Sequence, residues 1–261
     1  MQIRELMTAD PVSTTPEAEL ADSLRILHDR RFRSLPVVSS DGAVIGLLTE
    51  ARASAATEGK VADAMSPDVV TARPDETVVD VLNRGQWAMQ EAVLVVADGR
   101  LVGIVTESDA CKHAARVLSE DLSVEDHANT SMVCIEGSRP AQEALERLRR
   151  SFVHDLVVLD DRVLHGILSI RDLVAARADE DESLTCGSLV RDGTHPTVQW
   201  DTPLRKAAEL MVEHDVACVP VVSDDGQQRV EAVVSRGDVI RALLISGEVG
   251  EGDKSIEDVL L

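Results

Sequence analysis

Hydrophobic and polar positions follow one pattern that occurs four times along the 261 residues of the chain. Each copy begins with a short β-branched segment, at residues 11–15, 68–71, 132–135 and 196–199. An amphipathic segment follows: in the first copy Leu20, Leu24 and Leu27 recur at helical spacing, with polar residues between them. In the fourth copy the same spacing runs from Leu204 to Met211. These segments predict a strand followed by a helix.

Two apolar runs joined by a short turn come next in each copy, at residues 35–48, 93–105, 156–168 and 219–234. The turns contain Asp-Gly or Asp-Asp, and Asp-Gly between β-branched runs is a strong hairpin signal. Each hairpin ends at a hydroxyl residue that opens a further helix, at Thr49, Thr106, Ser169 and Ser235. The sequence therefore predicts an α/β fold of four tandem β-α-β-β-α units, roughly 60 residues apart.

This unit resembles the cystathionine β-synthase (CBS) domain over nearly the whole chain. The resemblance is carried by the strands Leu-Pro-Val-Val (35–38) and Val-Pro-Val-Val (219–222), by the strand ends Gly-Leu-Leu-Thr (46–49) and Gly-Ile-Val-Thr (103–106), and by the Thr/Ser-x-x-Asp openers. It implies that the repeats pair through their sheets into two Bateman modules, which form a disc. The first module would span residues 1–118 and the second 119–246, followed by an acidic tail at 247–261. Residues 120–123 would join the modules, and residues 178–183 would join repeats 3 and 4.

The helix openers are the candidate binding residues. In repeats 2, 3 and 4 the hydroxyl is followed three positions later by a carboxylate, in the pairs Thr106 and Asp109, Ser169 and Asp172, and Ser235 and Asp238. Unpaired N–H groups at a helix start favour phosphate oxygens, and a carboxylate can accept both hydroxyls of a ribose. The resemblance implies that these pairs contact adenosine ligands. The alternative is that each pair is only a capping box.

Repeat 1 departs from this pattern, because Arg52 stands in place of the aspartate and has no acceptor for ribose hydroxyls. Arg52 could instead point toward a phosphate that a neighbouring repeat holds.

Basic residues near the openers would complete the clefts. Arg33 and His154 precede the second strand of repeats 1 and 3, where members of the family often carry phosphate-contacting residues, whereas repeats 2 and 4 have Gln90 and Ala217 there. Arg171 and Arg236 flank the openers. Each could instead be a solvated arginine, and His154 a structural histidine. Because paired repeats face each other, we expect Arg33 to reach toward repeat 2 and His154 toward repeat 4. The expected order of the clefts is 3 and 4 together, then 2, then 1.

Charge narrows the class of partner. The chain has 47 Asp+Glu against 26 Lys+Arg, a net charge of −21 and an isoelectric point near 4.6, which disfavours nucleic acids and anionic membranes as partners. The basic residues include only Lys60, Lys112, Lys206 and Lys254 as lysines. Excess acid with scarce lysine favours a halophilic archaeon as the source, and a GC-rich genome is the alternative. The four cysteines lie far apart without a metal-binding or redox motif, so we expect them to be buried thiols rather than zinc ligands.

No catalytic motif occurs in the sequence, so we expect a regulatory protein rather than an enzyme, with no obligatory cofactor and no metal. The expected ligand is an adenosine nucleotide (AMP, ADP or ATP), with S-adenosylmethionine as an alternative, and the expected output is modulation of an unidentified partner protein. A structural scaffold with empty clefts is the rival function. The sequence lacks a long apolar run and a signal-peptide core, which favours the cytoplasm. A monomeric disc and a homodimer both remain open.

Overall fold

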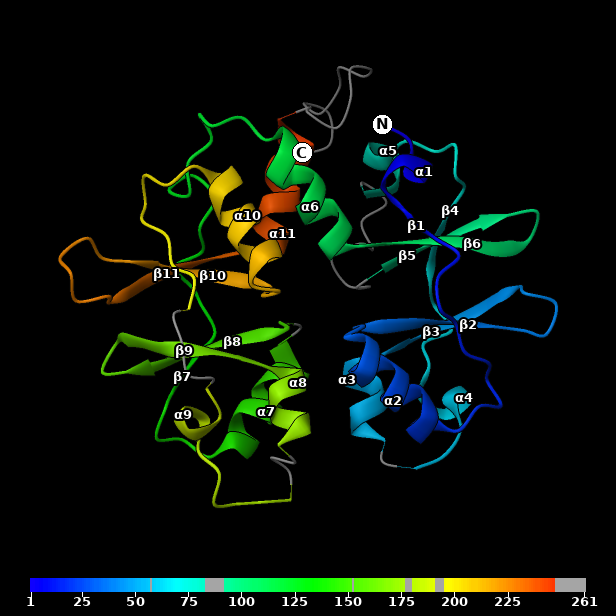
Figure 1. The fold of residues 1–261 in the computed structure, drawn as a ribbon, viewed down its shortest axis with the longest axis horizontal. Coiled ribbons are helices and arrows are strands. Elements are labelled where there is room, and N and C mark those ends of the chain that lie inside the picture. The colour runs from blue at the N-terminus through cyan, green and yellow to red at the C-terminus, as the bar shows by residue number, and fades with distance from the viewer. Residues whose placement is uncertain (57, 83–91, 152, 177–179, 191–194, 247–261) are drawn as a thin grey trace.

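The computed structural model describes residues 1–56, 58–82, 92–151, 153–176, 180–190 and 195–246. It contains the predicted α/β architecture, with the hairpin and both main helices of each repeat arranged around the centre of a flat molecule (Figure 1). The predicted tail at 247–261, the position Gln90 and part of the predicted 178–183 linker lie outside the described residues.

Repeat 1 and its leading segment comprise α1 (Ile3–Leu6), β1 (Thr8–Ala9), α2 (Leu20–Arg30), β2 (Ser34–Val38), β3 (Val44–Thr49) and α3 (Glu50–Ala55). Repeat 2 comprises α4 (Val61–Ala64), β4 (Val70–Ala72), α5 (Val78–Leu82), β5 (Ala92–Ala97), β6 (Arg100–Thr106) and α6 (Glu107–Val117). Repeat 3 comprises β7 (Cys134–Glu136), α7 (Ala141–Ser151), β8 (Asp155–Asp160), β9 (Val163–Ser169) and α8 (Ile170–Ala175). Repeat 4 comprises α9 (Cys186–Leu189), α10 (Leu204–Glu213), β10 (Cys218–Val222), β11 (Val230–Ser235) and α11 (Arg236–Ile245).

The leading strand of each repeat is shorter than predicted, and in repeats 1 and 4 the reason lies in the second strand. Repeats 2 and 3 form the three-residue strands β4 and β7, which pair in parallel with β5 and β8. In repeats 1 and 4 the predicted strands at 11–15 and 196–199 shrink to single bridges, Thr14 with Val37 and Val198 with Val221. The preceding residues there are Pro36 and Pro220, which have no N–H to extend the ladder. Prolines within the hairpins thus shorten the sheets of these two repeats.

Repeats pair by exchanging their leading segments. The segment before repeat 1 adds β1 to β6 of repeat 2, and the segment before repeat 2 pairs Ser66 with Leu47 of repeat 1. In the other half, Asn129 before repeat 3 pairs with Val233 of repeat 4. The hairpin faces then bury apolar side chains against each other, with Leu47 packed among residues of β5 and β6, and Val157 among residues of β10 and β11. The predicted pairing of repeat 1 with 2 and of repeat 3 with 4 is confirmed.

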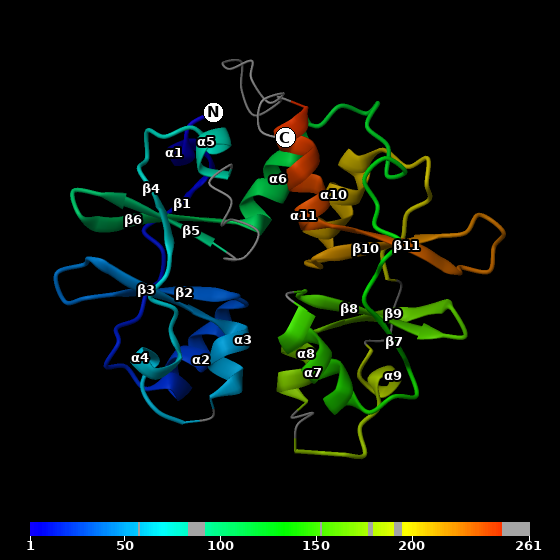
Figure 2. The same cartoon turned by 180° about the vertical axis from the view of Figure 1, so that it is seen from behind.

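The two pairs meet through two unlike interfaces. Helix α6 of repeat 2 packs against α10 and α11 of repeat 4, and the buried residues of these two repeats form one continuous apolar core. Both views show these helices side by side (Figures 1 and 2). Repeats 1 and 3 also face each other, but through polar contacts: Arg149 donates to the Ser54 carbonyl at 3.0 Å, and Arg171 to the Arg31 carbonyl at 3.1 Å. The polar interface opens onto the candidate site.

Burial agrees with the predicted helix faces and with most of the predicted thiols. Leu20, Leu27 and the whole predicted face of α10 are buried. Cys111, Cys186 and Cys218 are buried thiols, whereas Cys134 is partly exposed. Within the described ranges, no helix has both the length and the apolar character needed to cross a membrane.

Candidate functional site

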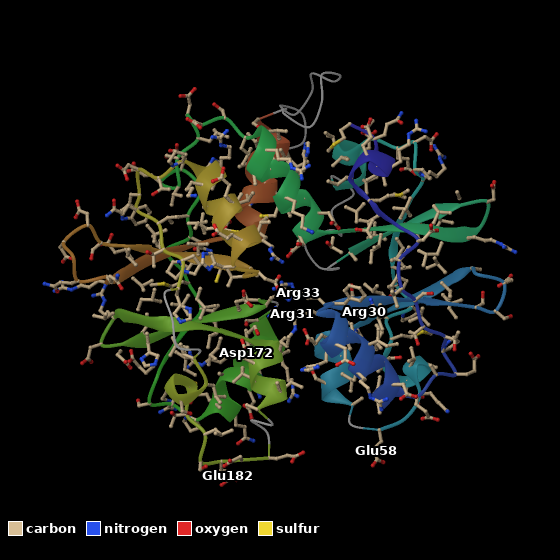
Figure 3. The ribbon with its side chains drawn as sticks, viewed as in Figure 1. Arg30, Arg31, Arg33, Glu58, Asp172 and Glu182 are labelled. Carbon is tan, nitrogen blue, oxygen red and sulfur yellow. The ribbon has the colours of Figure 1, made fainter. Side chains whose placement is uncertain are left out.

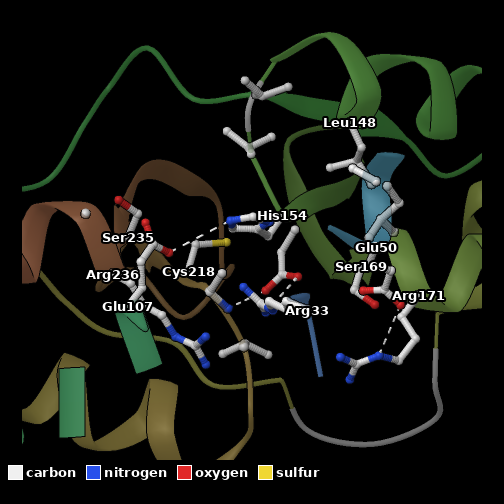
Figure 4. Close-up of a pocket in the computed structure, with 18 of the residues that line it drawn as sticks. Arg33, Glu50, Glu107, Leu148, His154, Ser169, Arg171, Cys218, Ser235 and Arg236 are labelled. Carbon is white, nitrogen blue, oxygen red and sulfur yellow. Dashed lines mark hydrogen bonds and ion pairs between the residues drawn. The ribbon is translucent and has the colours of Figure 1, made fainter. Parts of the chain in front are cut away.

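A central cavity of about 1400 Å³ lies where repeats 1, 3 and 4 meet. It is lined by the helix openers Thr49, Ser169 and Ser235, by the start of repeat 2 near Asp68, and by Glu107 of α6. Figure 4 shows the Ser235 and Arg236 side, the Ser169 and Arg171 side, and Arg33 between them. The cavity therefore combines several of the predicted clefts into one space.

A recurring backbone hydrogen bond places the predicted basic positions beside the openers. The N–H of the residue after the opener donates to the carbonyl of the residue that precedes the second strand. These bonds join Glu50 to Arg33 at 2.7 Å, Ile170 to His154 at 3.3 Å, and Arg236 to Ala217 at 2.9 Å. Residues 16 or more positions apart in sequence thus meet at the centre of the disc.

The openers form the predicted capping boxes. The Ser169 hydroxyl donates to Asp172 Oδ2 at 2.6 Å and accepts from the Asp172 N–H at 3.2 Å. Ser235 and Asp238 repeat this arrangement at 2.6 and 3.3 Å. Both pairs line the cavity. Capping uses Oδ2 of each aspartate, and Asp238 Oδ1 accepts a hydrogen bond from Arg241 Nη1 at 3.2 Å.

The opener of repeat 2 is capped in the same way but lies elsewhere. Thr106 donates to Asp109 Oδ2 at 2.7 Å, and Asp109 Oδ1 faces Lys112 at 3.8 Å. Neither Thr106 nor Asp109 is among the described residues that line the cavity, although Glu107 between them is. In repeat 1, Thr49 accepts only the Arg52 N–H, at 3.3 Å, and both residues line the cavity.

The ion pairs of Arg33 and His154 cross the disc, but their paired repeats are also close: Arg33 attracts Glu107 of repeat 2, and Arg236 of repeat 4 repels the charged form of His154. Arg33 Nη2 lies 3.9 Å from Asp155 Oδ1 of repeat 3, and His154 Nε2 lies 3.9 Å from Glu107 Oε2 of repeat 2. That Arg33 reaches a phosphate held by repeat 2, and His154 one held by repeat 4, stays a prediction. Arg31 and Arg33 lie where repeat 1 meets repeat 3, with Asp172 across this boundary (Figure 3). The centre is therefore shared between the two pairs of repeats.

Arg171 and Arg236 are also built into ion pairs rather than solvated. Arg171 lies 3.6 Å from Glu50 and 3.7 Å from Asp215, and Arg236 lies 3.7 Å from Asp215. The Arg236 side chain is 4% exposed, and its Nε has no hydrogen-bond partner. Arg33 Nη1 is likewise buried without a partner. Both nitrogens are covered by protein atoms, while the two arginines themselves line the cavity.

Burial changes the charge that the centre carries. Desolvation, reinforced by Arg33 and Arg236, lowers the pKa of His154 to about 3, so this histidine is neutral at physiological pH. It can accept or donate a hydrogen bond but does not supply the positive charge that its position suggested. Desolvation also raises the pKa values of Glu107 and Glu50, against the attraction of nearby arginines. The pKa of Arg236 is lowered by burial and by Arg33.

Four central carboxylates were not singled out from the sequence: Glu50, Glu107, Asp155 and Asp215. Glu50 and Glu107 occupy the first helical position after an opener, so the repeat alignment could have located them. Asp155 follows His154 directly, at a place where repeats 1 and 4 have Ser34 and Cys218. The chain has 47 Asp+Glu, so composition alone did not distinguish these four carboxylates from the others. Together they offset the arginines of the cavity.

Comparison with known proteins agrees with this fold. The family model described as the CBS domain matches residues 3–56, 61–116, 124–179 and 195–245. The uncharacterized protein MJ1404 of Methanocaldococcus jannaschii is 25% identical over 92% of this chain, which spans 61% of that protein's length. The crystal structure of protein MJ1225 from the same organism superposes with a TM-score of 0.81 at 17% identity, covering 92% of this chain and 99% of the other. CBSX2 of Arabidopsis thaliana, crystallised with AMP, aligns with 44% of this chain and 97% of its own at a TM-score of 0.41 and 20% identity.

Proposed function

The chain belongs to the CBS domain family, and from this premise we propose that its central cavity binds an adenosine ligand and that binding regulates a partner protein. The observation that carries the proposal is the pair of hydroxyl–aspartate openers, Ser169 with Asp172 and Ser235 with Asp238, on the wall of one cavity. Each combines a helix start, suited to a phosphate, with a carboxylate suited to ribose hydroxyls.

The charge of the cavity supports an anionic ligand. Among the described lining residues, seven arginines stand against seven carboxylates, whereas the whole chain has a net charge of −21. The cavity wall is therefore close to neutral within a strongly acidic protein. Arg33 and Arg236 are among the arginines of this wall, where they can attract an anion.

A regulatory output follows from where the ligand would sit. The wall combines residues of repeats 1, 3 and 4, so a ligand there contacts both modules, which we propose to span residues 1–118 and 119–246. A ligand can shift the arrangement of the modules only if it binds two arrangements with different affinity. The interface between repeats 1 and 3 is polar and adjoins the cavity, so it is the part that we expect to respond. We expect a cytoplasmic protein without catalytic activity of its own.

Calorimetric titration of the whole chain tests this function. AMP, ADP, ATP and S-adenosylmethionine are titrated separately, with GMP as a control for the base and ribose 5-phosphate as a control for the sugar. Saturable binding of an adenosine ligand that exceeds both controls would support the proposal. The absence of binding by all four adenosine ligands would favour the rival function, a structural scaffold whose clefts stay empty.

A further inference from the structure

Asp155 places a buried negative charge at the centre of the cavity. Its side chain is 2% exposed, less than that of Arg33 beside it, and it begins strand β8. Its Oδ2 accepts the backbone N–H of Ala217, and its Oδ1 faces Arg33 Nη2 at 3.9 Å. The backbone hydrogen bond holds Oδ2 in place, whereas Oδ1 is buried without a hydrogen-bond partner and meets Arg33 only as an ion pair. The predicted phosphate-contacting residue Arg33 is thus already paired with an internal anion.

Further charged groups surround Asp155 in the cavity. Arg33 pairs with Asp155, and Arg236 interacts electrostatically with both Asp155 and Glu107. His154 adds no positive charge near neutral pH, because its pKa is lowered to about 3. Asp215, which pairs with Arg236, is 49% exposed and adds a further carboxylate toward the solvent. Arg33 and Arg236 thus lie near one fixed carboxylate, near Glu107, whose pKa is raised by burial, and near Asp215, which also pairs with Arg31 and Arg171.

Such a centre discriminates ligands by their charge. A phosphate monoester carries between one and two negative charges near neutral pH. Arg33 and Arg236 line the cavity and can meet that charge. A triphosphate adds further negative charge beside a carboxylate that is almost completely excluded from water. Like charges in a desolvated site repel strongly, since water does not screen them.

We propose that Asp155 determines how many phosphates the cavity accepts, so that adenosine ligands with one phosphate bind and ATP is selected against. This inference rests on the proposed function and adds the ligand class to it. Asp155 acts as an internal anion: it takes the place of a second phosphate beside Arg33. Neutralising Asp155 should release Arg33 for polyphosphates.

The test compares AMP with ATP in magnesium-free buffer at one fixed KCl concentration, by calorimetric titration of the whole chain. Asp155→Asn removes the charge while its side-chain oxygen can still accept the Ala217 N–H. Asp155→Glu retains the charge. Asp160→Asn is the matched control, because Asp160 ends the same strand, is 61% exposed and pairs with His165 away from the cavity.

We expect the wild type and Asp160→Asn to bind AMP at least about tenfold more tightly than ATP, and Asp155→Asn to reduce that ratio by about tenfold or more. Asp155→Glu should retain a preference for AMP. Equal binding of AMP and ATP by the wild type would overturn the inference, even if Asp155→Asn does not fold. An AMP-to-ATP ratio unchanged in a folded Asp155→Asn would overturn it as well. Absence of all adenosine binding by the wild type would instead overturn the proposed function, and this inference with it.

Discussion

His154 of repeat 3 faces Glu107 of repeat 2 across the centre of the disc, with 3.9 Å between Nε2 and Oε2. The two residues belong to different modules, yet burial moves both toward their neutral forms: the pKa of His154 falls to about 3 and that of Glu107 rises. Arg33 and Arg236 act on both, repelling the histidinium ion and attracting the glutamate ion. On acidification the two shifts act in opposite directions: the lowered pKa of His154 costs stability, whereas the raised pKa of Glu107 adds it.

The first prediction concerns acid stability. The pKa of His154 is about 3 in the folded protein and 6.5 in its ordinary state, so the unfolded chain takes up a proton first as the pH falls. The contribution of neutral His154 is thus fully present above about pH 6.5 and is lost as the pH falls toward 3. In His154→Gln the free energy of unfolding should therefore fall less steeply as the pH decreases, by up to about 1.4 kcal/mol per pH unit. Urea unfolding between pH 7 and pH 4 measures the effect.

The exposed His28 of α2 supplies the control for this prediction, as His28→Gln. It should leave the slope of stability against pH close to that of the wild type. An equal slope in wild type and His154→Gln would show that His154 takes up its proton in the folded protein as easily as in the unfolded chain.

The second prediction separates ligand binding from helix capping. Asp172→Ala, Asp238→Ala and Asp109→Ala each remove the same capping box, so each should lower the free energy of unfolding by about 0.5–2 kcal/mol. Of these three aspartates, Asp172 and Asp238 line the cavity, whereas Asp109 is not among the described residues that line it. Their substitution should weaken AMP binding by about 1–3 kcal/mol, the cost of losing hydrogen bonds to a charged group. Asp109→Ala should weaken it less.

Calorimetric titration and thermal unfolding of the same preparations measure both quantities. Arg52→Ala completes the set, since Arg52 has no acceptor for a ribose and its loss should leave ribose recognition intact. If all three aspartate variants bound AMP as the wild type does, the openers would be helix caps without a role in binding.

The sequence predicted the repeats well because their signals are local. The spacing of Leu20, Leu24 and Leu27, the hairpin turns and the hydroxyl openers each act within a few residues, and the structure places them as expected. The shortening of the leading strands to single bridges at Thr14 and Val198 was not predicted from the sequence, because it depends on prolines in a different strand.

The centre of the disc could be predicted only in part. Arg33 and His154 were identified by their position in the repeat, but their partners Asp155 and Glu107 depend on how two modules meet. That arrangement arises from the packing of α6 against α10 and α11, which no local pattern encodes. The neutral state of His154 likewise follows from burial and from arginines of other repeats.

The third prediction concerns the close approach of a leading segment to a hairpin. Gly46 of β3 has no room for a side chain, since a Cβ atom there would lie 2.8 Å from both Met65 Sδ and the Ser66 carbonyl oxygen. Because the backbone oxygen cannot move aside without breaking its bridge to Leu47, Gly46→Ala should destabilise the protein by about 1–3 kcal/mol.

Gly237 in the first turn of α11 is the matched control. A Cβ atom there would meet no atom closer than 3.6 Å, so Gly237→Ala should be neutral or stabilising by up to about 1 kcal/mol. Denaturant unfolding of both variants makes the comparison. Equal stability of the two would mean that the leading segment yields to the added methyl group and does not fix the pairing of repeats 1 and 2.

The fourth prediction concerns salt. The cavity wall balances its arginines and carboxylates, so the net charge of −21 belongs to the rest of the chain. Repulsion among exposed carboxylates opposes the compact state, and salt screens it over a Debye length that falls to about 3 Å at 1 M. The melting temperature should therefore rise as KCl increases from millimolar to molar concentrations, as a halophilic origin would require. A melting temperature that stays constant or falls over this range would favour the GC-rich genome as the reason for the scarcity of lysine.

Buried pairs such as Arg33 with Asp155 are shielded from salt. The increase in melting temperature should therefore come from the outer surface and should persist in Asp155→Asn.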